Sequence, residues 1–285
     1  MVLVIGIFAA CTTEPSTTPV DETSQVTIVS IGPNVTEILL ALDPGISQRL
    51  VAMDNMSVDV PGVPEGIPLL DMFAIDVETI LMLEPTIVIA SDMIQMGGDP
   101  LALVSQAGTQ VVYIPMADSL EGIMDSFHHI ATAAGLGDLG GYNLFNEMAY
   151  EIEKVRAIAA TITERRTVYF EIGSVPSLFS FGEGTFLHEI VEIIGAINIF
   201  AGYGTWVSVA EEQILARNPD VILTNEQWVE DPIGEIKSRP GWGSLDAVIN
   251  NRVHLIDANA SSRPSHNVVA AMWEIARAVY PEYFE

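Results

Sequence analysis

Two glutamates, Glu78 and Glu212, occupy the same place in a duplicated stretch of the sequence. Residues 78–89 and 212–223 share the pattern Glu-x-Ile-Leu-x-x-x-Pro-x followed by three aliphatic residues, and the offset is 134 for both the glutamate (212 − 78) and the proline (219 − 85). An acid in the first turn of a helix is stabilised by the helix dipole by about 0.3–1 kcal/mol, which explains why one is tolerated but not why both copies carry one. Two such carboxylates could instead dock a two-fold symmetric partner that offers arginines.

Aromatic side chains gather in loops next to predicted strands. In open α/β sheets, the loops at the carboxyl ends of the strands form the ligand crevice, and large aromatic walls suit a bulky, flat or apolar small molecule. For any single aromatic, packing on its own half of the chain is the alternative. The candidate ligand-binding aromatics are Phe73, Phe179, Phe181, Trp206 and Trp228. Five methionines could add an adaptable apolar wall or fill the core: Met53, Met56, Met72, Met93 and Met96.

Arg263 is a further candidate ligand-binding residue. It is one of only 11 basic residues, and it stands in a loop after a predicted strand. Its guanidinium could bind a carboxylate or phosphate of a ligand. An ion pair that caps a helix or braces two halves of the chain is the alternative.

Patterns for catalysis, metal binding and nucleotide binding are weak. The five histidines form no H-x-x-x-H or H-E-x-x-H pair, and no G-x-S-x-G elbow occurs. Gly135-Leu136-Gly137-Asp138-Leu139-Gly140 matches the dinucleotide fingerprint in letters only, because it follows a predicted helix and not a strand. We therefore predict no catalytic residue, no resident metal and no cofactor.

The net charge of −27, with Lys154 and Lys237 the only lysines, argues against nucleic acid or an anionic membrane surface as a partner. The hydrophobic content of 49% against 17% charged residues favours an ordered globular protein. An acid-rich, lysine-poor surface is also typical of salt-adapted proteins, because salt screens the self-repulsion.

The first residues resemble an export signal. A short apolar run from Val2 ends in Phe8-Ala9-Ala10-Cys11, which predicts a bacterial-type lipoprotein signal over 1–11 with a lipidated Cys11. No Lys or Arg precedes the run, and a truncated signal or a buried strand is the alternative. The polar residues 12–25 predict a tether. Nine apolar residues are too few for a hydrocarbon core that needs about 20, so we expect a membrane association through the lipid anchor only.

Alternating strands and helices predict an α/β fold of two Rossmann-like lobes with mostly parallel sheets. After a strand from Val26, Asn34 is predicted as a helix N-cap with Glu37 completing a capping box. Residues 142–163 lack Gly and Pro and show apolar residues at steps of three and four, which predicts one long helix. The predicted organisation is an N-terminal lobe over 26–141, an interlobe helix over 142–165 and a C-terminal lobe over 166–285.

These motifs, in this order, resemble the cobalamin and iron-siderophore class of ABC-transporter substrate-binding proteins from Val26 to the C-terminus. The resemblance is carried by Pro33-Asn34-x-Thr36-Glu37, the two glutamate motifs, the long helix, Gly182-x-Gly184-Thr185-Phe186 and Asn198-Ile199-Phe200. It implies a ligand held between two lobes, and it implies that Glu78 and Glu212 bind arginines of a dimeric permease, which works with its ATPase. Trp206 falls where cobalamin binders place an aromatic that lines the cleft, and Phe179 falls near another. Met72, by contrast, stands where a cobalamin binder can have a tryptophan.

The resemblance implies a lipid-anchored receptor on the extracellular face of the cytoplasmic membrane, or in the periplasm, that is not an enzyme. It would bind a corrinoid such as cobalamin, or a ferric-siderophore or other iron complex, and deliver it to the permease. Two other classes stay open: a protein that binds a bare transition metal or haem, and a chelatase-type enzyme of similar fold with His188 or His254 at its site.

Overall fold

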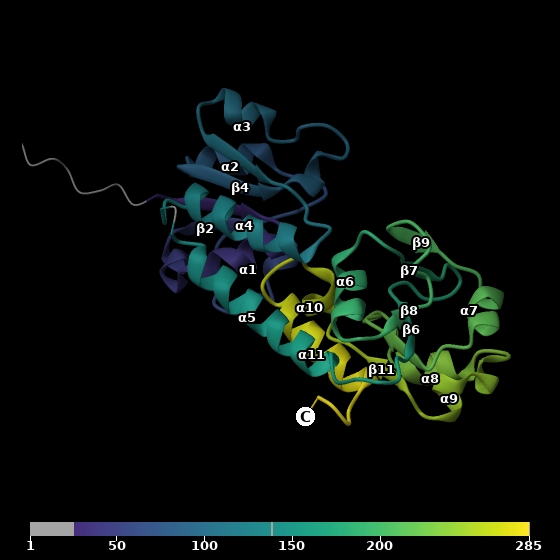
Figure 1. The fold of residues 1–285 in the computed structure, drawn as a ribbon. Helices are drawn as coiled ribbons and strands as arrows, with labels where there is room; N and C mark the ends of the chain where they lie inside the picture. The colour runs from purple at the N-terminus through teal and green to yellow at the C-terminus, as the bar shows by residue number, and fades with distance from the viewer. Residues whose placement is uncertain (1–25, 138, 285) are drawn as a thin grey trace, which may run out of the picture.

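A computed structural model describes residues 26–137 and 139–284, which form two α/β lobes (Figure 1). The expected lipidation at Cys11, the signal over 1–11 and the tether over 12–25 lie outside the described residues. Within the described part of the chain, no helix has the length and apolar character needed to cross a membrane.

The first lobe is built on a five-stranded parallel sheet in the order β3-β2-β1-β4-β5. Its central strands are apolar on both faces because helices cover both sides, as parallel sheets require. The strands are β1 (Ile28–Ile31), β2 (Leu50–Asp54), β3 (Leu69–Leu70), β4 (Ile87–Ser91) and β5 (Gln110–Ile114). The helices are α1 (Pro33–Leu42), α2 (Val77–Leu83), α3 (Ala102–Gln106) and α4 (Leu120–Ala133), with 3₁₀ turns at Pro44–Gln48, Asn55–Ser57 and Asp92–Gln95.

The second lobe is built on a four-stranded parallel sheet in the order β11-β10-β6-β8. Its strands are β6 (Thr167–Glu171), β8 (Ile197–Asn198), β10 (Val221–Thr224) and β11 (Val253–Leu255). The helices of this half are α6 (Phe186–Ile193), α7 (Glu211–Arg217), α8 (Pro232–Ser238), α9 (Asp246–Ile249), α10 (Ala258–Ser262) and α11 (Val268–Val279), with a 3₁₀ turn at Trp242–Ser244. The order β8-β6-β10-β11 repeats the order β2-β1-β4-β5 of the first lobe, so the predicted α/β fold of two parallel sheets is confirmed.

The duplicated stretch has the same backbone shape in both lobes. Helix α2 ends at Glu84 with φ 45°, and α7 ends at Asn218 with φ 43°, each a left-handed residue immediately before the shared proline. Proline cannot continue a helix, so the chain turns there into the buried strand, β4 or β10. The sequence repeat is therefore a repeat of helix, left-handed cap and central strand.

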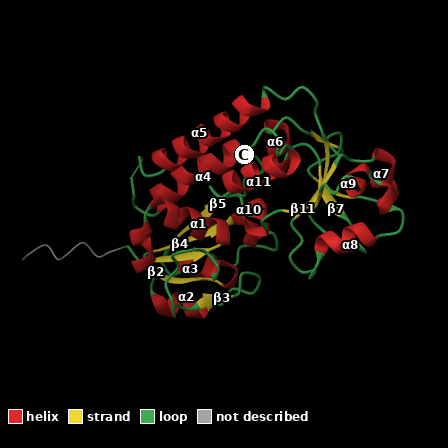
Figure 2. Ribbon diagram, turned by 90° about the horizontal axis from the view of Figure 1, so that it is seen from below, coloured by secondary structure: helices red, strands yellow, loops and turns green. Residues whose placement is uncertain are grey.

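Helix α5 (Tyr142–Ala159) leads from the first lobe to the second, and α11 lies beside it (Figure 2). It is four residues shorter than the predicted 142–163. Its buried face consists of Met148, Ile152 and Val155, which belong to one apolar core that includes residues of both lobes and of α11. This shared core joins the lobes along one side.

The start of helix α1 differs from the sequence prediction. Helix α1 is capped by Gly32 with φ 114° and not by Asn34, because the Gly32 N–H donates to Asp54 Oδ2 at 2.8 Å and holds the chain in a conformation that favours glycine. The predicted capping box is wrong, and the Glu37 carboxylate points instead to residues near the C-terminus.

Candidate functional site

A cavity of about 260 Å³ lies where strand ends of the two lobes meet. Met116, Ala117 and Asp118 follow β5 of the first lobe, whereas Ile172 follows β6 and Asn225 follows β10 of the second. Parallel strands place their carboxyl ends at one edge of a sheet, so these segments converge by topology. The remaining lining residues are Phe186, Leu187, Trp206, Ser261, Ser262 and Pro264. We call this space the cleft cavity.

Trp206 is the predicted aromatic that the structure places in the cleft cavity. It stands at the start of β9 (Trp206–Ser208), which pairs antiparallel with β7 (Phe179–Phe181), two strands in a region that the sequence had suggested to be loop. The ring is about half exposed, so one face is free for a ligand.

Phe181 is placed differently from its prediction as a ligand contact. It is 1% exposed and packs on Phe170 with ring centroids 5.5 Å apart. Its ring and that of Trp206 are arranged edge to face, with centroids 6.5 Å apart. Directly paired residues of an antiparallel ladder point to the same face, so the two rings are neighbours, and it is the packing on Phe170 that places the phenyl ring in the core. Phe181 therefore supports Trp206 from behind and has no face for a ligand.

The other predicted aromatics do not line the cleft cavity. Phe73, after β3, is 82% exposed, and Trp228, after β10, is 83% exposed. Phe179 in β7 is partly exposed. The structure does not bring these three aromatics together with Trp206 in the cavity.

The methionines divide between core and surface. Met53 and Met72 are buried, Met93 is half-buried, and Met56 and Met96 are exposed. The cavity is lined instead by Met116, which closely follows β5 and is not among the five predicted methionines. The thioether of Met116 and the indole of Trp206 come from opposite lobes, so a ligand between them would contact both.

The cavity lining has little charge. Asp118 is its one ionisable side chain among the described residues, and none of the lining residues is an arginine or lysine. Asn225 and the hydroxyls of Ser261 and Ser262 provide neutral hydrogen-bonding groups. This lining suits a ligand whose buried part is neutral, because a buried carboxylate without a cationic partner is costly.

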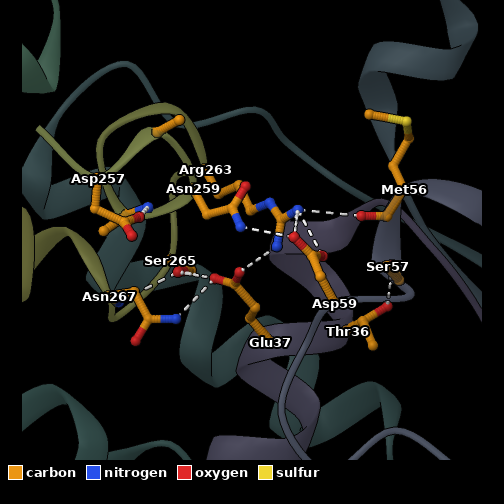
Figure 3. A network of polar contacts seen from close by, with 12 residues as sticks. Thr36, Glu37, Met56, Ser57, Asp59, Asp257, Asn259, Arg263, Ser265 and Asn267 are labelled. Atoms are coloured by element: carbon orange, nitrogen blue, oxygen red, sulfur yellow. Dashed lines mark hydrogen bonds and ion pairs between the residues drawn. The ribbon is translucent and has the colours of Figure 1, made fainter. Parts of the chain in front are cut away.

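Arg263 lies behind the cavity wall and binds the first lobe (Figure 3). Its Nη1 donates to Glu37 Oε1 at 2.8 Å, and its Nη2 donates to Asp59 Oδ1 at 2.9 Å and to the Met56 carbonyl at 3.2 Å. The side chain of Arg263 is 11% exposed and that of Glu37 is 4% exposed. These contacts favour the ion-pair interpretation of Arg263, since its guanidinium is occupied by protein carboxylates.

The electrostatics of this ion pair are mutually reinforcing. Burial by itself would raise the pKa of Asp59, but the hydrogen bond and charge of Arg263 outweigh burial and lower the pKa of that carboxyl. Burial opposes the charge of Arg263 as well, yet Glu37 and Asp59 raise its pKa. Glu37 also accepts hydrogen bonds from the Ser265 hydroxyl and the Asn267 side-chain amide, so three residues of one segment, 263–267, donate to its buried carboxylate.

Segment 258–263 is tied to the second lobe from its other side. Asn225, at the end of β10, donates through Nδ2 to the hydroxyls of Ser261 at 3.0 Å and Ser262 at 3.1 Å. Asn259 in the same segment binds the first lobe, since its side-chain amide donates to Asp59 Oδ2 at 2.6 Å.

The contacts of Arg263 cross from this segment to the first lobe. We call the contacts of Arg263 with Glu37, Asp59 and the Met56 carbonyl the interlobe brace.

Glu78 and Glu212 lie in the first turns of α2 and α7, and both are exposed. Asp76 caps α2 and accepts from the Glu78 N–H, so the Glu78 carboxylate is not needed as a cap. In α7, the neighbouring Glu211 accepts from Trp242 Nε1 at 2.9 Å and leaves Glu212 facing solvent. Within the described residues, neither the Glu78 nor the Glu212 carboxylate has a hydrogen-bond or ion-pair partner.

Among the described residues, the lining of the cleft cavity contains no histidine and no cluster that could hold a metal ion. Across residues 26–137 and 139–284, no group of three His, Cys, Asp or Glu side chains is arranged to hold a metal ion. His188 is buried against Asn198. His254 lies in β11, where its burial, and to a smaller extent the charge of Lys237, lowers its pKa. Neither histidine lines the cavity, so the chelatase candidates are placed elsewhere.

Comparison with known proteins gives one consistent family. The family model described as periplasmic binding protein matches residues 28–260. The chain is 27% identical over 261 residues to an uncharacterized ABC transporter substrate-binding lipoprotein, YvrC, of Bacillus subtilis, covering 90% of this chain and 81% of that protein. It is 26% identical over 252 residues to the vitamin B12-binding protein of Vibrio cholerae, covering 87% of each. A crystal structure of a possible iron-binding, periplasmic solute-binding protein from Staphylococcus epidermidis superposes with a TM-score of 0.80 at 26% identity, covering 90% of this chain and 98% of that one.

Proposed function

The chain belongs to the periplasmic binding protein family, and from this premise we propose that it is the substrate-binding component of an ABC importer for a corrinoid. It is a binding protein and not an enzyme. The cleft cavity between the lobes is the proposed seat of the ligand, with Trp206 and Met116 as its apolar contacts. No bond is made or broken in this role, and affinity comes from the burial of ligand surface between two preformed lobes.

The lack of any basic residue in the cavity lining, where Asp118 is the one ionisable side chain among the described residues, is the observation that carries the choice of ligand. Haem has two propionate carboxylates, and a ferric siderophore with net negative charge has the same need for cationic partners. The nearby Arg263 is already paired with Glu37 and Asp59, and no basic residue lines the cavity. A corrinoid has a rim of neutral amides, which the Asn225 side-chain carbonyl and the Ser262 hydroxyl can bind, since the Asn225 Nδ2 is already engaged with Ser261 and Ser262.

The cavity would hold one edge of such a ligand, since 260 Å³ is smaller than the usual range of about 300–1,000 Å³ for small-molecule sites. The rest of the ligand would lie against the strand-end loops outside it. Phe73, Phe179 and Trp228 are the exposed aromatics there. We propose them as outer contacts of the ligand.

Transfer of the ligand is assigned to Glu78 and Glu212. Both carboxylates are exposed, without side-chain partners among the described residues, and placed at equivalent points of the two lobes. We propose that they bind arginines of a dimeric permease, one lobe on each subunit. In this account Cys11 anchors the receptor to the outer face of the membrane through its lipid.

A thermal-shift panel tests the proposed ligand class. Purified protein is heated with cyanocobalamin, cobinamide, haemin and a ferric siderophore, each at the same concentration. A ligand at 100 times its Kd stabilises the folded state by about 2.7 kcal/mol, which is easily seen as a rise in melting temperature. A rise with the corrinoids and none with the anionic chelates supports the proposal. A rise confined to haemin or the siderophore contradicts it.

A further inference from the structure

The wall of the cleft cavity and the interlobe brace are parts of one short segment. Ser261, Ser262 and Pro264 line the cavity, whereas Arg263 between them points to the first lobe. A change in the position of the Arg263 guanidinium would therefore move residues on both sides of it in the wall. The brace lies next to the proposed ligand without being part of its contact surface.

This segment is fixed to both lobes by different groups. Asn225 binds Ser261 and Ser262 from the end of β10 in the second sheet. Glu37 on α1 and the 3₁₀ turn with Met56 bind Arg263 from the first lobe, at sequence separations of 226 and 207 residues. The chain of contacts thus runs from one sheet to the other directly along the cavity.

The turn that receives Arg263 is itself rigidly held. Asp54 is fully buried and accepts from the Gly32 N–H at 2.8 Å, the Met56 N–H at 2.9 Å and the Ser57 hydroxyl at 2.6 Å. Ser57 is in turn within 3.0 Å of the Thr36 hydroxyl on α1. Because these groups are satisfied and buried, the turn presents the Met56 carbonyl and Asp59 in one position.

We propose that Arg263 is a positioning residue for ligand binding, which sets the spacing of the two lobes and so pre-organises the cleft without touching the ligand. The effect on affinity follows from population arithmetic, since the apparent Kd equals the intrinsic Kd divided by the fraction of molecules in the competent spacing. If loss of the brace lowers that fraction to about one tenth, the apparent Kd rises about tenfold. The affinity part of this inference rests on the proposed function, whereas the spacing part does not.

Lobe spacing can be measured without any ligand. Spin labels are attached to two introduced cysteines, Met82→Cys on α2 and Ala216→Cys on α7, in a Cys11→Ser background. The two positions are equivalent in the repeat (216 − 82 = 134), and both are exposed. We expect a single narrow distance distribution by pulsed electron paramagnetic resonance, and a broadened or shifted one after Arg263→Met. A distribution unchanged by Arg263→Met would overturn the inference.

Affinity is then measured with cyanocobalamin by titration calorimetry. Arg263→Met should raise the Kd about tenfold. Arg263→Lys should have a Kd between those of the wild type and Arg263→Met, because lysine keeps the charge but not the forked geometry of the guanidinium. Arg166→Met is the matched control: Arg166 pairs with Glu282 at 2.7 Å and is not among the residues that line the cavity, so its loss should lower the melting temperature and leave the Kd unchanged. An equal loss of affinity in both variants would reduce Arg263 to a general stabilising role and contradict the inference.

A second variant covers the case in which Arg263→Met does not fold. Asp59→Asn removes the charge of the half-exposed partner of Arg263 and leaves the ion pair between Arg263 and the buried Glu37 in place. It should broaden the spin-label distances by a smaller amount in the same direction, and unchanged distances would contradict the brace. If the wild-type protein does not bind cyanocobalamin, the ligand proposal fails, and the spin-label distances still decide the role of Arg263.

Discussion

Glu37 and Arg263 are separated by 226 positions in the sequence and form an ion pair of 2.8 Å with both side chains largely buried. Glu37 lies on α1, and Arg263 directly follows the short helix α10 in the C-terminal part of the sequence. The pair therefore connects the beginning of the first lobe to a segment that the second sheet holds through Asn225. This arrangement connects the relative position of the lobes to the wall of the cleft cavity.

The Glu37–Arg263 pair should contribute strongly to stability. Glu37→Gln leaves the buried guanidinium with only the half-exposed Asp59, and loss of one partner of a buried pair costs about 3–5 kcal/mol when no charge compensates. Since Asp59 still compensates in part, we expect a loss of about 2–3 kcal/mol in the free energy of unfolding, measured by urea denaturation. Glu153→Gln removes an exposed partner of Arg156 and should change it by less than about 0.5 kcal/mol. Equal effects of the two variants would contradict the assigned importance of the buried pair.

Glu78→Ala combined with Glu212→Ala should abolish ligand uptake through the transporter and leave ligand affinity intact. Both carboxylates are exposed and lie on helices whose first turns do not line the cleft cavity, so their removal leaves the binding site unchanged. Uptake of labelled ligand into cells or vesicles and the Kd of purified protein are measured in parallel. The control is Glu65→Ala with Glu164→Ala, which removes the same charge from two other exposed positions. Normal uptake in the first double variant would rule out the docking role.

Acidification should destabilise the protein through His266. Burial lowers the pKa of His266 below its usual 6.5, although Glu37 and Glu147 act in the opposite direction, and its Nδ1 is buried without a hydrogen-bond partner among the described residues. The unfolded chain therefore binds the proton more readily, so this contribution to stability is fully present above pH 6.5 and is lost as the pH falls through the lower folded-state pKa. His254, whose pKa burial also lowers, acts in the same direction.

Melting temperatures at pH 7.5 and pH 5.5 test this effect. The decrease between the two should be smaller in His266→Gln than in the wild type, because glutamine does not titrate. His129→Gln, at an exposed position on α4, serves as the control and should keep the wild-type decrease. A decrease of the same size in His266→Gln would exclude His266 as the origin of the effect.

Salt should raise the melting temperature. With a net charge of −27, the folded chain repels itself, and the screening length shrinks from about 10 Å at 0.1 M salt to about 3 Å at 1 M. We expect a higher melting temperature in 1 M than in 0.1 M potassium chloride at pH 7.5, measured by differential scanning fluorimetry. The rise in melting temperature between 0.1 M and 1 M salt should be smaller at pH 4, because some of the carboxylates are protonated there and the net negative charge is lower. A melting temperature that falls or stays constant with salt at pH 7.5 would contradict this expectation.

Local patterns in the sequence predicted the lobes, and contacts between distant segments decided the details of the site. The repeat around Glu78 and Glu212 revealed two equivalent units because helix, proline turn and strand are encoded within a dozen residues. The sequence does not decide between the two interpretations of Arg263, because its partner Glu37 is 226 residues away and resembles a capping-box acid in its local context.

The aromatics show the same division. The sequence predicts that Trp206 and Phe181 both face a ligand, yet the contact of Phe181 with Phe170 of β6, which no local pattern specifies, buries the phenyl ring. Met116 follows a strand like the other cavity residues, and its position after β5 was a signal available in the sequence. The convergence of Asn225 with Ser261 and Ser262 depends on strand order, which no local pattern specifies.

Calorimetric titration of the wild type and Trp206→Ala with cyanocobalamin tests the central proposal most directly. We expect one site per chain in the wild type and a Kd at least tenfold weaker in Trp206→Ala, because the indole supplies the aromatic wall of the cleft cavity. Tyr150→Ala, an exposed aromatic on α5 that does not line the cavity, should bind as the wild type does. Absence of binding by the wild type, or an unchanged Kd in Trp206→Ala, would contradict a corrinoid site between the lobes.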